Sequence, residues 1–194
     1  GTRNIRFTGG GEPLVHPEIK KMLLMPKRYG MRSCIITNGG LLDEEICELL
    51  ISNIDHIRIS INAAENSTRQ HLHRPEVQGT SLSYILQQIK TLVQLRQVVW
   101  PSQKRPLVWA TFLLLPENLN EIYLAAQTMR ECGVDSISFR PVYHDLSRQF
   151  SERELDILHR QLELASTLHS PPTFQVFTPK RDIGTAGRIP PSPY

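Results

Sequence analysis

The sequence predicts an α/β fold in which a parallel β-sheet is covered by helices. Short runs rich in β-branched residues alternate with stretches of helical periodicity, which gives five or six successive β–α units. One run, Leu107–Leu114, is apolar throughout, as expected for a strand whose two faces are both covered. Periodicity leaves two architectures open: an open, doubly wound sheet, or a complete or partial barrel.

The first half of the chain is expected to contain three strands, over Ile5–Thr8, Ser33–Thr37 and Ile54–Ile61. A helix is expected from Pro17 to about Tyr29, with Pro26 ending or kinking it. Asp43 is suited to the N-cap of the next helix, because its carboxylate can accept a hydrogen bond from the first turn. The polar stretch 62–80 is expected to be a loop.

The second half continues the alternation, with strands expected over Leu107–Leu114, Val134–Arg140 and Phe174–Phe177. Apolar stripes predict a helix around residues 85–93 and another over 119–129. Ser151 and Glu154 form a capping box that opens a further helix. Residues 1–177 are therefore expected to form one domain, and 178–194, rich in Pro and Gly, a linker toward a further region.

Composition narrows the class of protein. The chain has 194 residues and a formal net charge of +3, and its charges are scattered, which does not favour nucleic acid as a partner. No apolar run approaches the roughly 18 residues of a membrane span. The three cysteines are widely spaced, without the spacing of a metal motif, which favours a reducing, cytoplasmic location. No metal site is predicted within the chain.

The chemistry of a parallel α/β sheet lies where its strands end. After the first strand, three glycines, Gly9, Gly10 and Gly11, precede Glu12 and Pro13. Glycines allow positive φ and leave the backbone open to a ligand, and a carboxylate beside open carbonyls suits an ammonium group. The alternative is a tight turn with a solvated Glu12.

Polar residues also follow other strands. Thr37 and Asn38 end the second strand, where they offer ligand contacts or simply form a turn. The third strand places Ser60 and Asn62 on its polar face. Arg140 ends an apolar strand, where a buried guanidinium would need an anionic partner from the protein or a ligand.

Together these segments resemble the radical SAM (S-adenosylmethionine) superfamily. Residues 5–13 are similar to its Gly-Gly-Glu-Pro motif at the end of the second barrel strand, and segments 37–39, 58–62 and 139–141 are similar to the ends of later strands. The resemblance implies a partial (βα)6, TIM-like barrel that here lacks its first strand. The tail, residues 183–190, resembles the approach to a SPASM-type auxiliary-cluster region.

The resemblance also implies a SAM site. Its residues would be Gly9, Gly10, Gly11, Glu12, Pro13, Thr37, Asn38, Ser60, Asn62, Arg74, Arg140 and Val142. The glycines and Glu12 would hold the methionine amino group, Ser60 and Arg74 the carboxylate end, and Val142 would pack on adenine. Asn62 stands where many members have Asp, and Arg140 would face the substrate.

The implied cofactors are SAM and a [4Fe–4S] cluster, which together generate a 5′-deoxyadenosyl radical that takes hydrogen from a small-molecule or peptide substrate. An electron donor such as flavodoxin or ferredoxin is implied as a partner. In the family, the cluster ligands form a Cys-x3-Cys-x2-Cys loop, which this chain lacks, so they are expected upstream of Gly1, the alternative being a cluster-free relative that has lost catalysis. The alternatives are a non-catalytic binding module on the same scaffold and a phosphosugar-type barrel, which Glu12 disfavours by repelling phosphate.

Overall fold

A computed structural model describes residues 1–73, 81–142, 146 and 149–179. Six strands form one sheet: β1 (Asn4–Phe7), β2 (Arg32–Thr37), β3 (His56–Ser60), β4 (Leu107–Leu114), β5 (Ser136–Pro141) and β6 (Gln175–Phe177). The helices are α1 (Ile19–Arg28), α2 (Glu44–Asn53), α3 (Asn66–His73), α4 (Leu82–Val99), α5 (Ile122–Glu131) and α6 (Glu152–Ser166). Two short 3-10 helices, η1 (Pro13–Val15) and η2 (Pro116–Glu121), follow β1 and β4.

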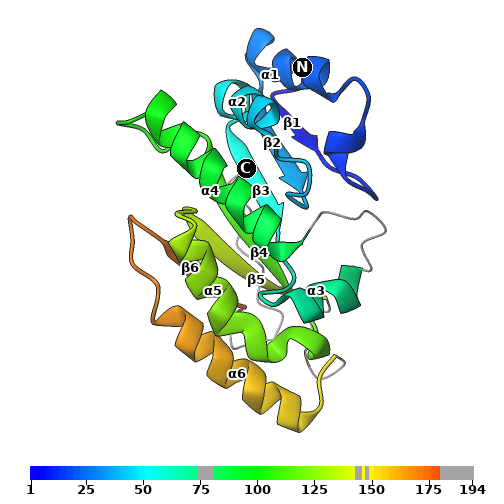
Figure 1. Cartoon of the computed structure of the whole chain (residues 1–194), viewed down its shortest axis with the longest axis vertical. Helices are drawn as coiled ribbons and strands as arrows, with labels where there is room; N and C mark the ends of the chain where they lie inside the picture. The colour runs from blue at the N-terminus through cyan, green and yellow to red at the C-terminus, as the bar shows by residue number, and fades with distance from the viewer. Residues whose placement is uncertain (74–80, 143–145, 147–148, 180–194) are drawn as a thin grey trace.

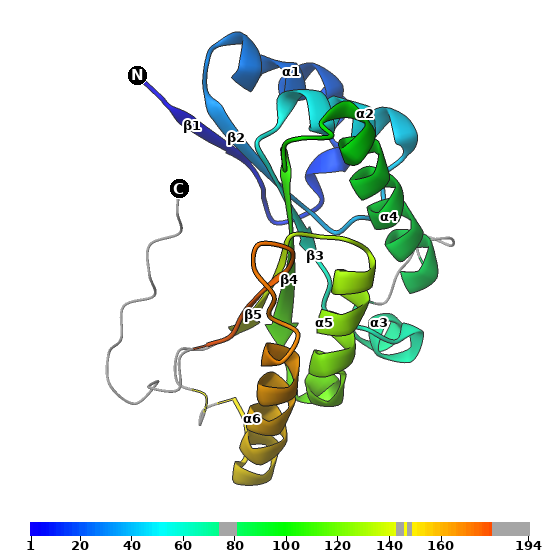
Figure 2. The same ribbon diagram turned by 90° about the vertical axis from the view of Figure 1, so that its left-hand side faces the viewer.

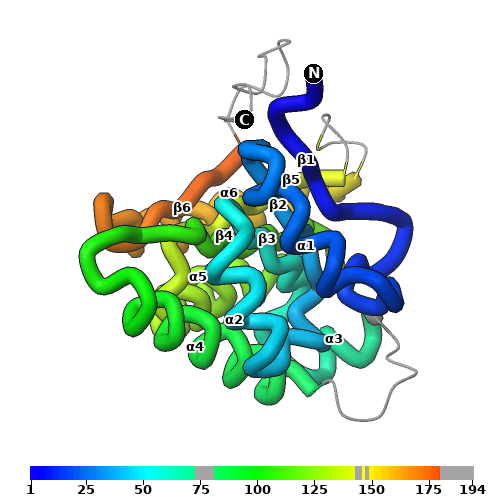
Figure 3. The backbone as a smooth tube through the Cα atoms, turned by 90° about the horizontal axis from the view of Figure 1, so that it is seen from above, coloured from blue at the N-terminus to red at the C-terminus, as the bar shows by residue number. Residues whose placement is uncertain are grey.

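The sheet resolves the choice that periodicity leaves open. Its strands lie in sequence order from β1 to β6, and every neighbouring pair is parallel. The helices lie on one side of the sheet, and its other side is left open by them (Figures 1 and 2). From above, the elements curve around this open side (Figure 3). This is a partial barrel, and in the described part of the chain β6 does not pair with β1, so the barrel is not closed.

Alternation along each strand builds the core. In β3, Ile57 and Ile59 are buried, whereas Arg58 and Ser60 between them are half-buried. In β4, Phe112 is fully buried on the same side as these isoleucines. The core therefore lies between the sheet and its helices, and the polar positions line the open face.

The region 62–80, expected to be a loop, contains helix α3 in its described part. A buried carboxylate explains how this polar segment is held. Glu121, at the end of η2, accepts hydrogen bonds from the backbone N–H groups of Ala64 (2.6 Å) and Glu65 (3.1 Å), just before α3 begins, and from the Thr68 hydroxyl. Because this support comes from more than fifty residues away, local periodicity does not reveal it.

Of the two effects expected of Pro26, that of ending the helix is not observed, because α1 runs on to Arg28, close to the expected end at about Tyr29, with Pro26 inside it. The turn after the proline is held by backbone bonds in which Tyr29 N donates to Met25 O (3.1 Å) and Met31 N donates to Pro26 O (2.8 Å). Gly30 then adopts φ of 65°, in the left-handed region that glycine favours, and follows the end of the helix.

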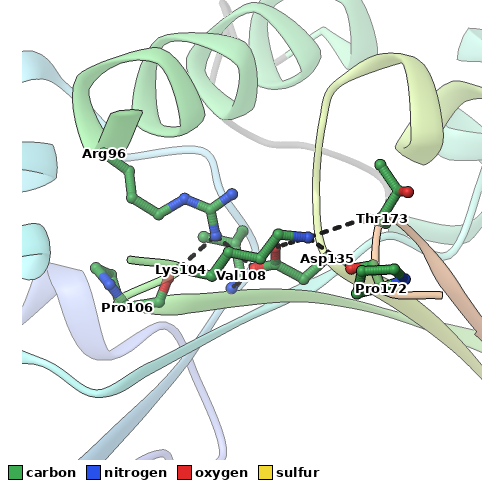
Figure 4. A network of polar contacts seen from close by, with 7 residues as sticks. All are labelled: Arg96, Lys104, Pro106, Val108, Asp135, Pro172 and Thr173. Carbon is green, nitrogen blue, oxygen red and sulfur yellow. Dashed lines mark hydrogen bonds and ion pairs between the residues drawn. The ribbon is translucent and has the colours of Figure 1, made fainter. Parts of the chain in front are cut away.

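A buried ion pair stabilises the end of the sheet at which β4 and β5 begin (Figure 4). Arg96 reaches from α4 to Asp135, which precedes β5, and also donates to Pro106 O at 3.1 Å. Asp135 accepts from Val108 N at 2.8 Å, and Lys104 Nζ lies 3.6 Å from its other oxygen. A charged pair so placed ties α4, β4 and β5 together.

Within the described residues, no helix is long and apolar enough to cross a bilayer.

Candidate functional site

The loop after β1 carries the three glycines at the carboxyl-terminal edge of the sheet. All three are exposed, and a Cβ atom added to Gly9, Gly10 or Gly11 would meet nothing within 4 Å. None of them has positive φ, so the left-handed conformation that glycine allows is not adopted there. The glycines therefore matter here through their accessibility, since a ligand can reach their backbone without meeting a side chain.

Glu12 joins the first two strands at this edge. One carboxylate oxygen, Oε1, accepts a hydrogen bond from Leu14 N at 3.1 Å and caps η1. The other, Oε2, accepts from Asn38 N at 2.6 Å, just beyond the end of β2. The residue is half-buried, so the carboxylate is held by two backbone N–H groups while part of it faces solvent.

The two polar residues after β2 stabilise a turn. Thr37 is buried, and its Oγ1 accepts from Gly39 N at 3.1 Å. Asn38 is exposed, and its Oδ1 accepts from Gly40 N at 2.8 Å. Gly39 has φ of 78° and packs against Ile59 and Ile85, so no larger residue fits there. The side chains of Thr37 and Asn38 thus shape the rim of the sheet.

Ser60 and Asn62 have different surroundings at the end of β3. Asn62 Oδ1 accepts from Leu113 N at 3.0 Å, and Asn62 O accepts from Asn118 Nδ2 at 2.9 Å. Asn118 is fully buried and also donates to Leu113 O at 2.8 Å, which fixes the ends of β3 and β4 to each other. The Ser60 hydroxyl, half-buried on the open face, has no hydrogen-bond partner among the described residues.

Of the remaining predicted residues, Arg140 and Val142 lie at the end of β5. Arg140 is exposed, and its Nε donates to the Ser138 hydroxyl at 3.4 Å, so the expectation that it is buried is wrong. Val142 keeps 48% of its surface exposed and is open to an apolar contact. Arg74 and the tail at 183–190 lie outside the described residues.

The open face also carries residues that were not predicted as site residues, because they lie within the strands and not after them. Arg58 lies over the Trp109 ring at 6.0 Å from its centroid, and His56 meets the same ring edge-on at 6.1 Å. Arg6 and Cys34 occupy paired positions on β1 and β2. The signal that reveals them is the two-residue alternation of polar positions within the strands, not the residues after them.

Burial controls the protonation of two groups on this face. It raises the pKa of the Cys34 thiol, an effect that nearby Arg58 and Arg6 partly oppose. It also lowers the pKa of His56, and Asp55 opposes that shift while three arginines add to it. Near neutral pH, Cys34 is therefore a thiol and His56 a neutral imidazole, so the arginines supply the charge of this face.

The described cysteines do not form a cluster site. Cys34 lies on β2, and Cys47 and Cys132 are buried in or beside helices on the other side of the sheet. Among the described residues, no group of three His, Cys, Asp or Glu side chains is placed to hold a metal ion.

Comparison with known proteins adds a family assignment. The family model described as the Radical SAM superfamily matches residues 1–129. A GTP 3′,8-cyclase from Chlorobaculum tepidum is 40% identical over 67 residues, which cover 34% of this chain and 20% of that protein. A tungsten-containing aldehyde ferredoxin oxidoreductase cofactor-modifying protein from Pyrococcus furiosus is 30% identical over 139 residues, 69% of this chain and 36% of that protein.

The fold has solved counterparts. A domain of pyruvate-formate lyase-activating enzyme from Bacteroides vulgatus matches with a TM-score of 0.66 at 18% identity, covering 92% of this chain and 99% of that one. At this level of identity the match concerns the fold alone. The chain spans only 20% and 36% of the lengths of the two curated relatives above.

Proposed function

The chain belongs to the radical SAM superfamily, and from that premise we propose that it is the SAM-binding part of an enzyme that starts radical chemistry on its substrate. The observation that carries this proposal is the position of Glu12. Its carboxylate lies beside the open backbone of the three glycines, at the edge of the sheet where parallel α/β folds bind ligands.

The residues at this edge fit SAM. Each carboxylate oxygen of Glu12 accepts one backbone N–H, and a carboxylate oxygen has room for a second donor, so an ammonium group can bind as well. Because a Cβ atom added to Gly9, Gly10 or Gly11 would meet nothing within 4 Å, a ligand can reach the neighbouring carbonyls. Ser60 supplies a hydroxyl without a protein partner among the described residues, at the end of β3.

Other residues complete the proposed site. Arg74 would pair with the SAM carboxylate, Val142 would pack on adenine, and Arg140 would face the substrate side. Thr37, Asn38 and Asn62 would act by holding the rim in shape, since their side chains already bond to backbone there. Pro13, at the first position of η1, would fix the exit of the glycine loop.

When bound and given one electron, SAM would supply the radical chemistry by which hydrogen is taken from the substrate. The described cysteines do not fit the [4Fe–4S] cluster that delivers this electron in the family, so no step is assigned to them. The chain's own part is to bind the amino group of SAM at Glu12 and to present its adenosyl end to the open face of the sheet.

We further propose a small-molecule or peptide substrate, an electron donor such as flavodoxin or ferredoxin, and a cytoplasmic location. The barrel would end near residue 177, with 178–194 as a linker.

The full-length protein, purified and reconstituted without oxygen, tests the function. We expect iron–sulfur absorbance and, after reduction with dithionite in the presence of SAM, formation of 5′-deoxyadenosine, measured by liquid chromatography and mass spectrometry. A protein that binds SAM but forms no 5′-deoxyadenosine would instead be a non-catalytic binding module. A protein that fails to bind SAM would contradict the assignment of the site.

A further inference from the structure

The strands of this sheet are basic in composition. They contain Arg6, Arg32, Arg58, Arg140 and His56, and none of the six strands contains Asp or Glu. Arg6 and Arg58 occupy positions that alternate with buried core residues, so they face the open side of the sheet. We call this open face of the strands the wall. Because its strands carry arginines and no carboxylates, the wall attracts anions.

A hollow lies on this wall below the rim. Its volume is about 270 Å³, and its lining includes Asn4, Arg6, Arg32, Cys34 and His56 from β1, β2 and β3. The hollow belongs to the body of the strands, because its lining residue Arg6 comes six residues before Glu12 and its lining residue His56 comes four residues before Ser60. It is therefore distinct from the edge at which Glu12 is proposed to hold SAM.

Aromatic rings continue the wall beside the arginines. Trp109 on β4 is half-buried, with the Arg58 guanidinium 6.0 Å from its ring centroid. Phe177 on β6, which is 44% exposed, lies with its ring centroid 6.3 Å from that of Trp109. Guanidinium groups bind phosphate oxygens in a paired geometry, and aromatic rings stack on planar bases.

We propose that this wall binds a nucleoside phosphate as the substrate, with Arg6 and Arg58 contacting its phosphates and Trp109 contacting its base. The inference rests on the proposed function, because it names the substrate class for the same partial barrel. β1 and β3 are two strand spacings apart, about 10 Å, so arginines on both strands suit a ligand with more than one negative group.

The test is equilibrium binding to the full-length protein by isothermal titration calorimetry. GTP and UTP serve as probes, since neither carries the adenine of SAM. Guanosine and uridine measure the affinity that the base and ribose give without phosphates. Tripolyphosphate measures the affinity that the phosphates give without a base. We expect at least one triphosphate to bind at least tenfold more tightly than its nucleoside and than tripolyphosphate. Arg6→Gln and Arg58→Gln should each weaken it about tenfold, the effect of losing one charged hydrogen bond.

Arg160→Gln is the matched control, because Arg160 is exposed on α6 and its replacement removes the same charge outside the wall. SAM affinity, measured in each variant, reports that the barrel remains folded. Trp109→Leu should also weaken the triphosphate. Absence of binding by both triphosphates, equal loss in the control, or tripolyphosphate binding as tightly as either triphosphate would overturn the proposal. Retained SAM binding and 5′-deoxyadenosine formation would then leave the proposed function in place.

Discussion

Among single residues, Glu12 has the largest expected effect on the site. Glu12→Gln keeps the size of the side chain but replaces one accepting oxygen with an amide NH2, which cannot accept from Leu14 N or Asn38 N. The charge that would attract an ammonium is also lost. We expect SAM affinity to fall at least tenfold, equivalent to about 1.4 kcal/mol or more, as measured by isothermal titration calorimetry.

Glu48→Gln is the control for this change, because Glu48 is exposed on α2 and its replacement removes the same charge from a different element. Unchanged SAM affinity in the Glu12 variant would remove this carboxylate from the site.

The cysteines give a second residue-scale prediction. Burial raises the pKa of Cys47 to about 12 and that of Cys132 to about 11, and both side chains are nearly inaccessible. The reactive thiolate is therefore scarce at pH 8, so iodoacetamide should leave both unmodified in the native protein and modify them after unfolding in urea. Mass spectrometry of the peptides measures this. Modification of Cys47 at its unfolded rate would show that α2 is not packed as described.

Residue identities alone predict only part of the candidate site. The sequence is enough to place Glu12 and Ser60 at strand ends, because periodicity marks where strands stop. It does not reveal that Glu12 is bonded to Asn38 or that Asn62 is joined to Asn118, since these contacts link residues 26 and 56 positions apart. Arg58 and Trp109 are visible as polar or aromatic positions within strands, but their contact depends on the pairing of β3 with β4.

Between elements, the buried pair Arg96–Asp135 joins α4 to the start of β5. Asp135→Asn keeps an oxygen that can accept from Val108 N but leaves the Arg96 charge buried without a counter-ion. We expect the free energy of unfolding to fall by about 3–5 kcal/mol, measured by urea denaturation.

An exposed ion pair provides the comparison. Lys20 on α1 and Glu45 on α2 keep 50% and 64% of their side chains exposed, so Lys20→Met should cost less than about 1 kcal/mol. Equal losses in the two variants would mean that the Arg96 charge reaches water in the native protein.

The elements themselves follow closely from local sequence where caps are strong. The capping box of Ser151 and Glu154 is present at the start of α6, and Asp43 caps α2 through Ile46 N at 2.8 Å. Helix α3 is the exception: its first turn depends on Glu121, whose contribution is tertiary. A polar segment without an apolar stripe gives no local reason to expect a helix there.

For the molecule as a whole, strand position in the sheet predicts local stability. Among the described residues, β1 and β6 are the outer strands and each pairs on one side, whereas β3 and β4 lie between two partners. Backbone amides of β1 and β6 should therefore exchange with deuterium before those of β3 and β4, as measured by mass spectrometry on the full-length protein. Exchange that is equally slow in β1 would show that a further segment pairs with its outer edge.

Glu12 also bears on how readily a ligand can bind. Both of its oxygens accept from backbone amides, one in η1 and one in the turn after β2, so the end of the glycine loop and that turn are held together by the protein itself. The conformational entropy of these two segments is then lost when the protein folds. Little further entropy has to be lost when a ligand binds, so binding is less opposed. Preorganisation of this kind favours recognition without rearrangement of the backbone at the entrance.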